Sequence, residues 1–356
     1  MKIAFILPSL KPTAPILVAQ DIIAGLRKCH PNVDVTVFYL KQSDLQVTFN
    51  VPTVKISFFK AIDFSNYDIV HSHMFKPDFY IFLHSMFKQK KTRFVSTLHS
   101  LFLEDLYDHY GYIKSRIFGL VWALSWSKFD RLAVLSHTSK TYYSKVLPFF
   151  EYKLSIINNG RDVDSSLIQN CSNDDVSCKI KALKNDKNIV IGTCCIVREL
   201  KGLELVIYAL AKNDSFDFVL IGDGPYLEYL IELSVKLGVR ERFHTLGRIE
   251  NAYVYVSLFD IYVMPSISEG FCLALLEAAA QKSNIVTSNI EIFKEIFPNE
   301  VTFFELGNVD SLVSAIGTSY KKDLGDDVYM KYKENYTVDV MSNNYYDLYI
   351  TMMNNK

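Results

Sequence analysis

Short apolar runs alternate along this chain with longer stretches whose apolar residues recur every three or four positions. The first run, Lys2–Leu7, predicts a buried strand. In the next stretch, Pro15–Lys28, apolar residues at helical spacing predict a helix, and Pro15 suits a first helical position. The pattern therefore opens with a strand followed by a helix.

This alternation recurs through the first half of the chain and starts again in the second half. Strands are predicted in the first half at Asp34–Leu40, Asp68–His71, Arg93–Leu98, Arg131–Leu135 and Leu154–Asn158. In the second half, strands are predicted at Asn188–Cys194, Phe216–Ile221, Asn284–Ser288 and Val301–Phe304, with helices at Leu203–Ala211, Val309–Tyr320 and Val338–Met353. Strands that alternate with helices imply an α/β fold with a doubly wound parallel sheet in each half.

A chain of 356 residues exceeds a single typical core, so we expect two domains. The first is predicted at 1–165 and the second at 188–335, joined by the polar, acid-rich stretch 166–187. Residues 336–356 are expected to form a terminal helix. Because doubly wound sheets bind ligands beyond the carboxyl ends of their strands, candidate chemistry is expected there.

Composition narrows the possible functions. The 38 basic and 39 acidic residues nearly cancel, which leaves no general field for nucleic acid. The six cysteines are scattered, and no second pair or histidine cluster near Cys171 and Cys178 completes a zinc site, so reduced thiols are expected. Met1–Pro8 is too short for a signal peptide, and no run is long enough to span a membrane. We therefore expect a cytoplasmic protein.

The most informative stretch is Phe259–Ala280. It predicts a short buried strand, a polar turn that carries Glu269, and an apolar helix that carries Glu277 eight positions later. If all these steps were helical, the two residues would lie roughly 12 Å apart along the axis, whereas the two acids of glycosidases lie about 5 to 9.5 Å apart. Two separate roles are therefore predicted, and a helix start is suited to a diphosphate.

The segment from Glu269 to Glu277 resembles the E-x7-E signature of the retaining, nucleotide-sugar-dependent glycosyltransferases of the GT-B fold, specifically glycosyltransferase family 4. The resemblance implies two Rossmann-like domains that face a cleft, with a terminal helix that crosses back to the first domain. It also implies that Glu269 faces the reacting sugar and that Glu277 binds the ribose.

Further donor-binding residues follow from the same resemblance. Lys201-Gly202 and the nearby Arg198 resemble the cationic element that holds the donor diphosphate, although the family arginine usually lies where Ile196 stands. Gly222-Asp223-Gly224-Pro225 resembles the family's turn after a strand, and Arg248-Ile249 the turn that contacts the base. The remaining implied donor contacts are Gly270, Phe271, Cys272 and Leu273, with Cys272 where a second glycine is common.

Histidines stand at predicted strand ends in the first half. His99 matches the family's Thr-apolar-His, whose imidazole contacts the donor sugar and helps to align the acceptor; the alternative is a strand-end histidine bonded to a neighbouring loop. His73 and Asp105 are weaker candidates for acceptor contact, and Asp105 could equally favour a helix start. A metal held by His71, His73 and His99 is disfavoured because no acidic or cysteine ligand accompanies them.

Two further patterns have alternative interpretations. Asp162 and Asp164 form a D-x-D, a manganese motif of another transferase fold, but the Asn-Gly turn before them explains the sequence, and no metal or cofactor is expected. The basic run Lys88–Arg93 and the apolar stretch Ile117–Trp126 fit either a surface that binds the inner face of a membrane or ordinary solvated and core segments.

Together the resemblance implies transfer of a hexosyl or N-acetylhexosaminyl group from a UDP-sugar to a saccharide acceptor, including a lipid-linked one, with retention and without a metal. Two rival functions share these features. One is a non-catalytic nucleotide-sugar-binding subunit of a heteromeric transferase. Two departures from the family pattern would suit it: Arg198 in place of an arginine at position 196, and Ala14 where the family commonly has a glycine. The other is a UDP-sugar 2-epimerase, which needs no acceptor.

Overall fold

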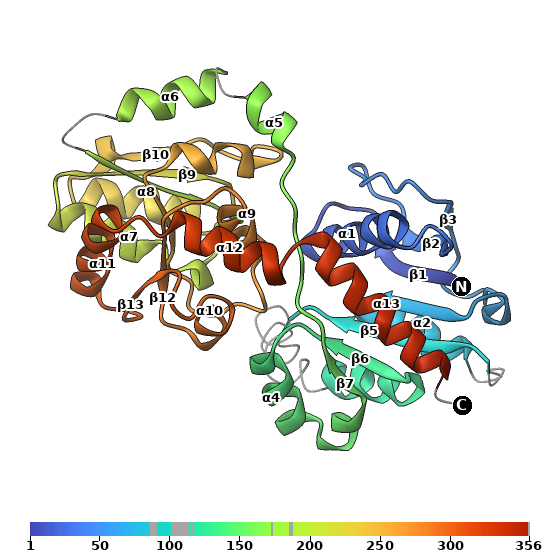
Figure 1. The fold of residues 1–356 in the computed structure, drawn as a ribbon. Helices are drawn as coiled ribbons and strands as arrows, with labels where there is room; N and C mark the ends of the chain where they lie inside the picture. Colours follow the sequence, from blue (N-terminus) through green and yellow to red (C-terminus); the bar gives the residue numbers. More distant parts are fainter. Residues whose placement is uncertain (86–90, 101–113, 115–116, 172–173, 185–187, 355–356) are drawn as a thin grey trace. The chain divides into compact units, whose positions relative to one another are not determined.

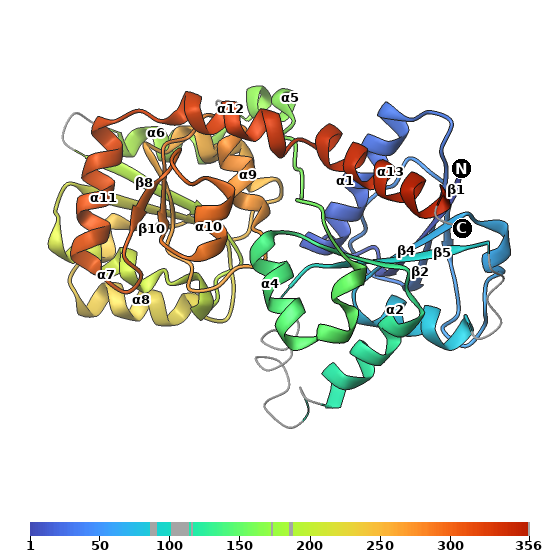
Figure 2. The same cartoon turned by 60° about the horizontal axis from the view of Figure 1, so that its bottom comes forward.

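The computed structural model describes residues 1–85, 91–100, 114, 117–171, 174–184 and 188–354. The chain divides into two compact units, one formed by Met1–Arg161 with Asn335–Lys356 and the other by Asp162–Glu334. Each unit is built around one parallel sheet with helices packed around it (Figures 1 and 2). The α/β fold with two Rossmann-like sheets is thus confirmed. Among the described helices, none combines the length and apolar character that crossing a membrane requires.

The sheet of the first unit has the order β3-β2-β1-β4-β5-β6-β7. Its strands are β1 (Lys2–Ser9), β2 (Asp34–Lys41), β3 (Thr53–Lys55), β4 (Ile69–His73), β5 (Arg93–Leu98), β6 (Arg131–Val134) and β7 (Leu154–Ile156). The strand order reverses between β1 and β4, so the carboxyl ends of these strands form the topological switch point where such sheets bind ligands. His73 ends β4 and His99 directly follows β5, which places both histidines at this edge.

The helices of the first unit are α1 (Ala14–Cys29), α2 (Phe75–His84), α4 (His137–Val146) and α13 (Val338–Asn354), with further helical residues at 117–125. Short 3₁₀ segments are η1 (Phe64–Asn66), η2 (Trp126–Lys128) and η3 (Pro148–Lys153). Helix α13, from the end of the chain, lies beside α1 in both views (Figures 1 and 2). Thus both ends of the chain contribute to one unit.

The sheet of the second unit has the order β10-β9-β8-β11-β12-β13. Its strands are β8 (Ile189–Cys194), β9 (Phe216–Ile221), β10 (Phe243–Thr245), β11 (Ile261–Met264), β12 (Ile285–Ser288) and β13 (Thr302–Phe304). The strand order reverses between β8 and β11, and the loops after these two strands carry the Lys201 and Glu269 motifs. The second unit therefore repeats the switch-point geometry of the first.

The helices of the second unit are α5 (Ser165–Asn170), α6 (Asp175–Leu183), α7 (Glu204–Lys212), α8 (Leu227–Lys236), α9 (Leu273–Ala279), α10 (Glu291–Ile296), α11 (Val309–Lys321) and α12 (Gly325–Asn335), with 3₁₀ segments η4 (Glu199–Lys201), η5 (Arg240–Arg242) and η6 (Ala252–Leu258). The stretch 166–187, expected to be a connector, contains α5 and α6 and groups with this unit. Both helices begin with an aspartate cap, Asp164 and Asp174, which explains why polar sequence becomes helical here.

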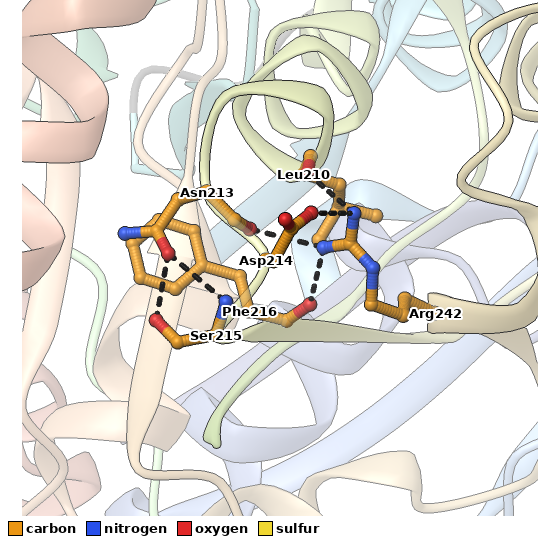
Figure 3. Close-up of polar contacts among 6 residues, drawn as sticks. All are labelled: Leu210, Asn213, Asp214, Ser215, Phe216 and Arg242. Atoms are coloured by element: carbon orange, nitrogen blue, oxygen red, sulfur yellow. Dashed lines mark hydrogen bonds and ion pairs between the residues drawn. The ribbon is translucent and has the colours of Figure 1, made fainter. Parts of the chain in front are cut away.

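Arg242 connects the end of α7 to the start of β9 through hydrogen bonds (Figure 3). Its guanidinium donates to the backbone oxygens of Leu210, Asn213 and Phe216 at 2.7, 3.0 and 3.1 Å, and pairs with the Asp214 carboxylate at 3.1 Å. The end of α7, the start of β9 and η5 are therefore joined by one side chain. The opposite, carboxyl edge of the sheet is left to the loops that carry the candidate chemistry.

Candidate active site

Glu269 is held by the loop that follows β11. Its Oε1 accepts hydrogen bonds from the Lys201 ammonium at 2.6 Å and from the Ser266 hydroxyl at 2.7 Å. Ser266 is itself fixed, because its backbone oxygen accepts a hydrogen bond from Ser288 at the end of β12. The carboxylate is therefore positioned by groups from three segments at the same sheet edge.

The Lys201 and Glu269 side chains form an ion pair that is mostly shielded from solvent, with exposed fractions of 25% and 11%. Burial alone would lower the pKa of Lys201, but the Glu269 charge, with smaller contributions from Cys272 and Cys195, raises the pKa above its usual value. Lys201 is therefore a permanent cation at neutral pH and cannot act as a base. A partly buried cation of this kind stabilises negative charge that develops on a bound ligand.

Two thiols border this ion pair. Burial, and next the Glu269 charge, raises the pKa of Cys272 to about 12, and burial raises the pKa of Cys195 to about 11. Both thiols are therefore neutral. Cys272 also precedes α9 with a φ of 69°, a backbone conformation that favours glycine, which accounts for the glycine that is common at this position in the resembled family.

Two glycines allow the loops of this edge to come together. A Cβ at Gly202 would lie 2.2 Å from the backbone oxygen of Pro265, and one at Gly222 would lie 1.9 Å from that of Cys195. Both residues have positive φ, at 61° and 156°. The Gly222 amide also donates to the Gly247 oxygen at 2.8 Å, so the turn after β9 is connected to the turn expected to contact the base.

The other predicted donor residues take varied positions. Arg198 and Arg248 are exposed, and Gly270, Leu273 and Ile249 are half-buried. Phe271 is buried, so a donor could meet its backbone but not its ring. Helix α9 begins only at Leu273, which leaves Glu277 one turn into the helix and half-buried. The first four of the eight steps from Glu269 to Glu277 are loop and cap, in line with the predicted turn that carries Glu269, so the distance for eight helical steps does not apply.

The first unit brings its strand-end histidines together. The Nδ1 atom of His73 lies 2.7 Å from Nε2 of His99, and the ring centroids are 4.9 Å apart. His71, two residues earlier in β4, instead bonds Tyr349 of α13 and Thr97 of β5, both at 2.7 Å. Thr97 also bonds Tyr345 of α13 at 2.8 Å. The strand predicted to end at His71 continues to His73, so His71 lies inside the sheet.

These histidines are neutral at physiological pH. Burial lowers the pKa of His99 to about 3, and burial together with the charge of His99 lowers that of His71 to about 3. Burial also holds the pKa of His73 well below its usual value. His99 is therefore equipped to hydrogen-bond a ligand rather than to carry a charge, as the sequence suggested.

Some predicted residues lie elsewhere. Asp105 lies outside the described residues, as does the first half of the basic run Lys88–Arg93, residues 88–90. Asp162 accepts a hydrogen bond from the Tyr332 hydroxyl, while Asp164 caps α5 through Ser166, so each aspartate has a structural partner. Within the described ranges no three His, Cys, Asp or Glu side chains gather as metal ligands would.

Two buried polar residues, Ser266 and Asp78, were not predicted from the sequence. Ser266 stands three residues before Glu269, and its side chain is buried and bonded to the carboxylate. Asp78 of α2 is fully buried and accepts from Ser72, Ser96 and the indoles of Trp122 and Trp126. Its only sequence signal was an acidic residue in a first helical turn.

Comparison with known proteins supports the same class. The family described as "Glycosyl transferases group 1" matches residues 175–336, and "Glycosyltransferase Family 4" matches residues 24–165. An Escherichia coli protein named O-antigen biosynthesis glycosyltransferase WclY is 32% identical, with 98% of each chain covered. A second Escherichia coli protein, a UDP-Gal:alpha-D-GlcNAc-diphosphoundecaprenol alpha-1,3-galactosyltransferase, is 26% identical over 73% of this chain and 68% of its own.

Solved structures share the fold. HepE from Anabaena, in complex with UDP, superposes with a TM-score of 0.79 at 17% identity and covers 99% of this chain and 100% of its own. The lipopolysaccharide outer core galactosyltransferase WaaB has a TM-score of 0.72 at 16% identity, with 99% and 100% covered. Two Rossmann-like units with motif loops at their carboxyl edges define the class as GT-B glycosyltransferases. Within this class, the chain belongs to glycosyltransferase family 4.

Proposed function

We propose that the enzyme transfers a hexosyl or N-acetylhexosaminyl group from a UDP-sugar to a saccharide acceptor in surface polysaccharide synthesis, with retention at the anomeric carbon. The observation that carries this proposal is the Lys201–Glu269 pair, fixed by Ser266 at the carboxyl edge of the second sheet. A partly buried cation and a positioned carboxylate at one edge suit a ligand with a diphosphate and a hydroxylated sugar.

In the proposed reaction, the acceptor hydroxyl oxygen bonds to the anomeric carbon as the bond from that carbon to the donor diphosphate breaks. The hydroxyl proton passes to the departing diphosphate oxygen, so no covalent enzyme intermediate forms. Lys201 stabilises the charge of the leaving diphosphate, which is why we propose a reaction that needs no metal. Glu269 and His99 orient the sugar, and Glu277 binds the ribose.

The names of similar proteins support the donor and acceptor classes. HepE has been crystallised with UDP and glucose, and the galactosyltransferase relative uses UDP-Gal and an acceptor linked to diphosphoundecaprenol. WclY is named for O-antigen biosynthesis. We therefore propose UDP-sugars as donors and include lipid-linked saccharides among the acceptors.

A lipid-linked acceptor would require contact with a membrane, and one face of the first unit suits such contact. Ile117, Leu120 and Leu124 recur at helical spacing with exposed fractions of 60%, 63% and 54%. The helix is flanked by exposed Lys114 and Lys128. Exposed aliphatic side chains beside lysines suit the surface of an anionic membrane, so we propose that this face contacts the inner face of the membrane.

The function is tested by nucleotide release from UDP-, GDP- and ADP-sugars, with and without a membrane extract that supplies acceptors, and with chelator present. We expect acceptor-dependent UDP release that survives chelator. In Glu269→Gln, the amide oxygen can still accept from Lys201 and Ser266, so the fold should persist, while kcat falls by about 10²-fold or more because the charge is lost. Glu228→Gln, an exposed carboxylate of α8, is the matched control.

Each rival function gives a different result. A donor that binds without any release identifies the non-catalytic subunit, and consumption of UDP-N-acetylglucosamine without acceptor identifies the epimerase. Loss of release on adding chelator would contradict the metal-independent mechanism. Full turnover by Glu269→Gln would remove Glu269 from the mechanism, and the anomeric configuration of the product decides between retention and inversion.

A further inference from the structure

The two strand-end histidines of the first unit share a hydrogen bond that constrains both rings. Nδ1 of His73 faces Nε2 of His99 at 2.7 Å. Both rings are neutral, because burial holds both pKa values far below physiological pH. Each neutral imidazole carries one N–H and one lone pair, so one proton lies between the two nitrogens. Two arrangements are possible, and they leave His99 with opposite properties toward a ligand.

In the first arrangement, His73 donates from Nδ1, and the proton of His99 must lie on its own Nδ1. In the second arrangement, His99 donates from Nε2, its Nδ1 is a lone pair, and the proton of His73 must lie on Nε2. The first arrangement makes His99 a hydrogen-bond donor toward a ligand, and the second makes it an acceptor. The outer nitrogen of His73 decides between them.

Nε2 of His73 is buried and has no hydrogen-bond partner among the described residues. Its neighbours are the rings of Phe5 and His71, with centroids 6.0 and 4.6 Å from that of His73. His71 cannot supply an acceptor, because both its nitrogens already bond Tyr349 and Thr97. A proton on Nε2 of His73 would therefore be a buried donor without an acceptor, which is rarer and more costly than a buried lone pair without a donor.

We propose that His73 is a positioning residue that donates from Nδ1 to Nε2 of His99 and thereby fixes His99 in the Nδ1–H tautomer. His99 then presents an N–H donor beyond the carboxyl end of β5. The group it would bind is an acceptor oxygen, such as a sugar hydroxyl or ring oxygen. The tautomer follows from the geometry of the first unit, whereas the identity of the bound group rests on the proposed function.

The tautomer is measured directly by ¹⁵N NMR of the full-length protein labelled in its histidines, with the His99 signals assigned by their loss in His99→Asn. We expect a protonated Nδ1 and a lone-pair Nε2 on His99. In His73→Asn, the side-chain amide nitrogen takes the place of Nδ1 and keeps the donor, so the His99 tautomer should persist. In His73→Leu no donor remains, and the His99 tautomer should shift or become mixed.

Transfer kinetics give a second readout. We expect His73→Leu to lower kcat/KM by on the order of tenfold, the equivalent of one neutral hydrogen bond, and His73→Asn to restore most of it. Tyr345→Phe is the matched control, because it removes a buried hydrogen bond to Thr97 while both nitrogens of His71 keep their partners and His99 is not touched. It should lower Tm but leave the His99 tautomer unchanged.

The outcomes separate this proposal from the proposed function. A protonated Nε2 on His99 in the natural protein would overturn the proposal, and so would an unchanged tautomer in His73→Leu. If no sugar transfer is found but His99 shows an Nδ1 proton that depends on residue 73, the proposed function fails while the positioning role of His73 stands. If His73→Leu does not fold, the natural protein and His73→Asn still decide through the NMR signals.

Discussion

Asp78 is a buried carboxylate that accepts from four donors. Its Oδ2 accepts from the indoles of Trp122 and Trp126 at 2.7 and 2.8 Å, and its Oδ1 accepts from Ser72 and Ser96 at 2.6 and 2.9 Å. Burial raises the pKa of Asp78 to about 6, although these hydrogen bonds oppose the increase. Because an indole can only donate, the carboxylate positions both tryptophans beside α2.

This raised pKa predicts a specific pH dependence of stability. The folded state retains the Asp78 proton up to about pH 6, whereas the unfolded chain releases it near pH 4, so the folded state binds more protons between these values. The contribution of Asp78 to stability is therefore fully present below about pH 4 and is lost as pH rises through 6. Relative to Asp78→Asn, the natural protein should lose roughly 3 kcal/mol of unfolding free energy across this window.

The measurement is denaturant unfolding of the natural protein and of Asp78→Asn at several pH values. The difference between their unfolding free energies removes the contributions of titratable groups that both proteins share. Asp44→Asn, at an exposed aspartate, is the control and should show the same pH profile as the natural protein. A profile of Asp78→Asn that runs parallel to that of the natural protein would show that the Asp78 pKa is ordinary. Asp78→Ala should destabilise more than Asp78→Asn, because it leaves two indole donors without an acceptor.

The sequence indicated candidate site residues but not the side chains that hold them in place. Lys201 and Glu269 were identified separately through the family resemblance, but only the fold brings residues 68 positions apart to a 2.6 Å contact. The hydrogen bond between Thr97 and Tyr345 could not be predicted for the same reason. It joins a strand and a helix that are far apart in the sequence and meet only after folding. The roles assigned to these residues stay predictions until they are tested.

Among the elements, the long periodic segments were predicted most closely. Strand β9 was predicted with its observed ends, and α13 differs at its end by one residue. The short strands β3 and β10 were missed because each contains a single large apolar residue, Val54 or Phe243, and so forms no apolar run. Helices α5 and α6 were missed because they lie in the stretch that its acidic residues identified as a connector, and their starts depend on aspartate caps.

The helical residues 117–125 allow the proposed membrane contact to be tested. Changing Ile117, Leu120 and Leu124 together to serine should preserve the fold, because all three are exposed. Binding to vesicles that contain anionic lipid should weaken by about tenfold or more, since each inserted aliphatic side chain contributes on the order of 1 kcal/mol. Cosedimentation with vesicles over a range of lipid concentrations measures this change.

A matched control removes exposed apolar groups from the second unit, through Val235→Ser and Met330→Ser, and should leave vesicle binding unchanged. Because exposed Lys114 and Lys128 flank the helix, binding should also weaken with salt. Equal binding by the triple variant and the natural protein would contradict the proposed contact. Binding to neutral vesicles alone would point to an apolar contact without a charge requirement.

The two units differ in how the chain builds them. The second unit, Asp162–Glu334, is continuous, whereas the first needs both ends of the chain. Helix α13 closes the first unit through an ion pair between Lys28 and Asp339 at 2.7 Å, and through His30, which stacks on Tyr346 and bonds Asn343. The strand that carries His71 is bonded to the same helix through Tyr349. We therefore expect α13 to stabilise β4, the strand that ends at His73.

At Gly25, α1 packs against α13 with no room for a Cβ atom, which provides a direct test of this dependence. A Cβ at residue 25 would lie 2.0 Å from the Ser342 hydroxyl and 2.7 Å from the Ser342 Cβ. Gly25→Ala should therefore separate the two helices and destabilise the first unit by about 1–3 kcal/mol. Hydrogen exchange should increase in α1, α13 and β4, while the strands of the second unit keep their protection.

The matched rescue is Ser342→Gly in the Gly25→Ala background, which removes both of the closest contacts; the next nearest atom belongs to Val338, at 3.0 Å. Glycine within α13 costs about 1 kcal/mol by itself, so the double variant should recover part of the protection rather than all of it. A favourable coupling energy between the two changes would show that the helices clash at this point. Exchange that increases equally in both units would instead show that the units unfold together, and that α13 does not govern the first unit separately.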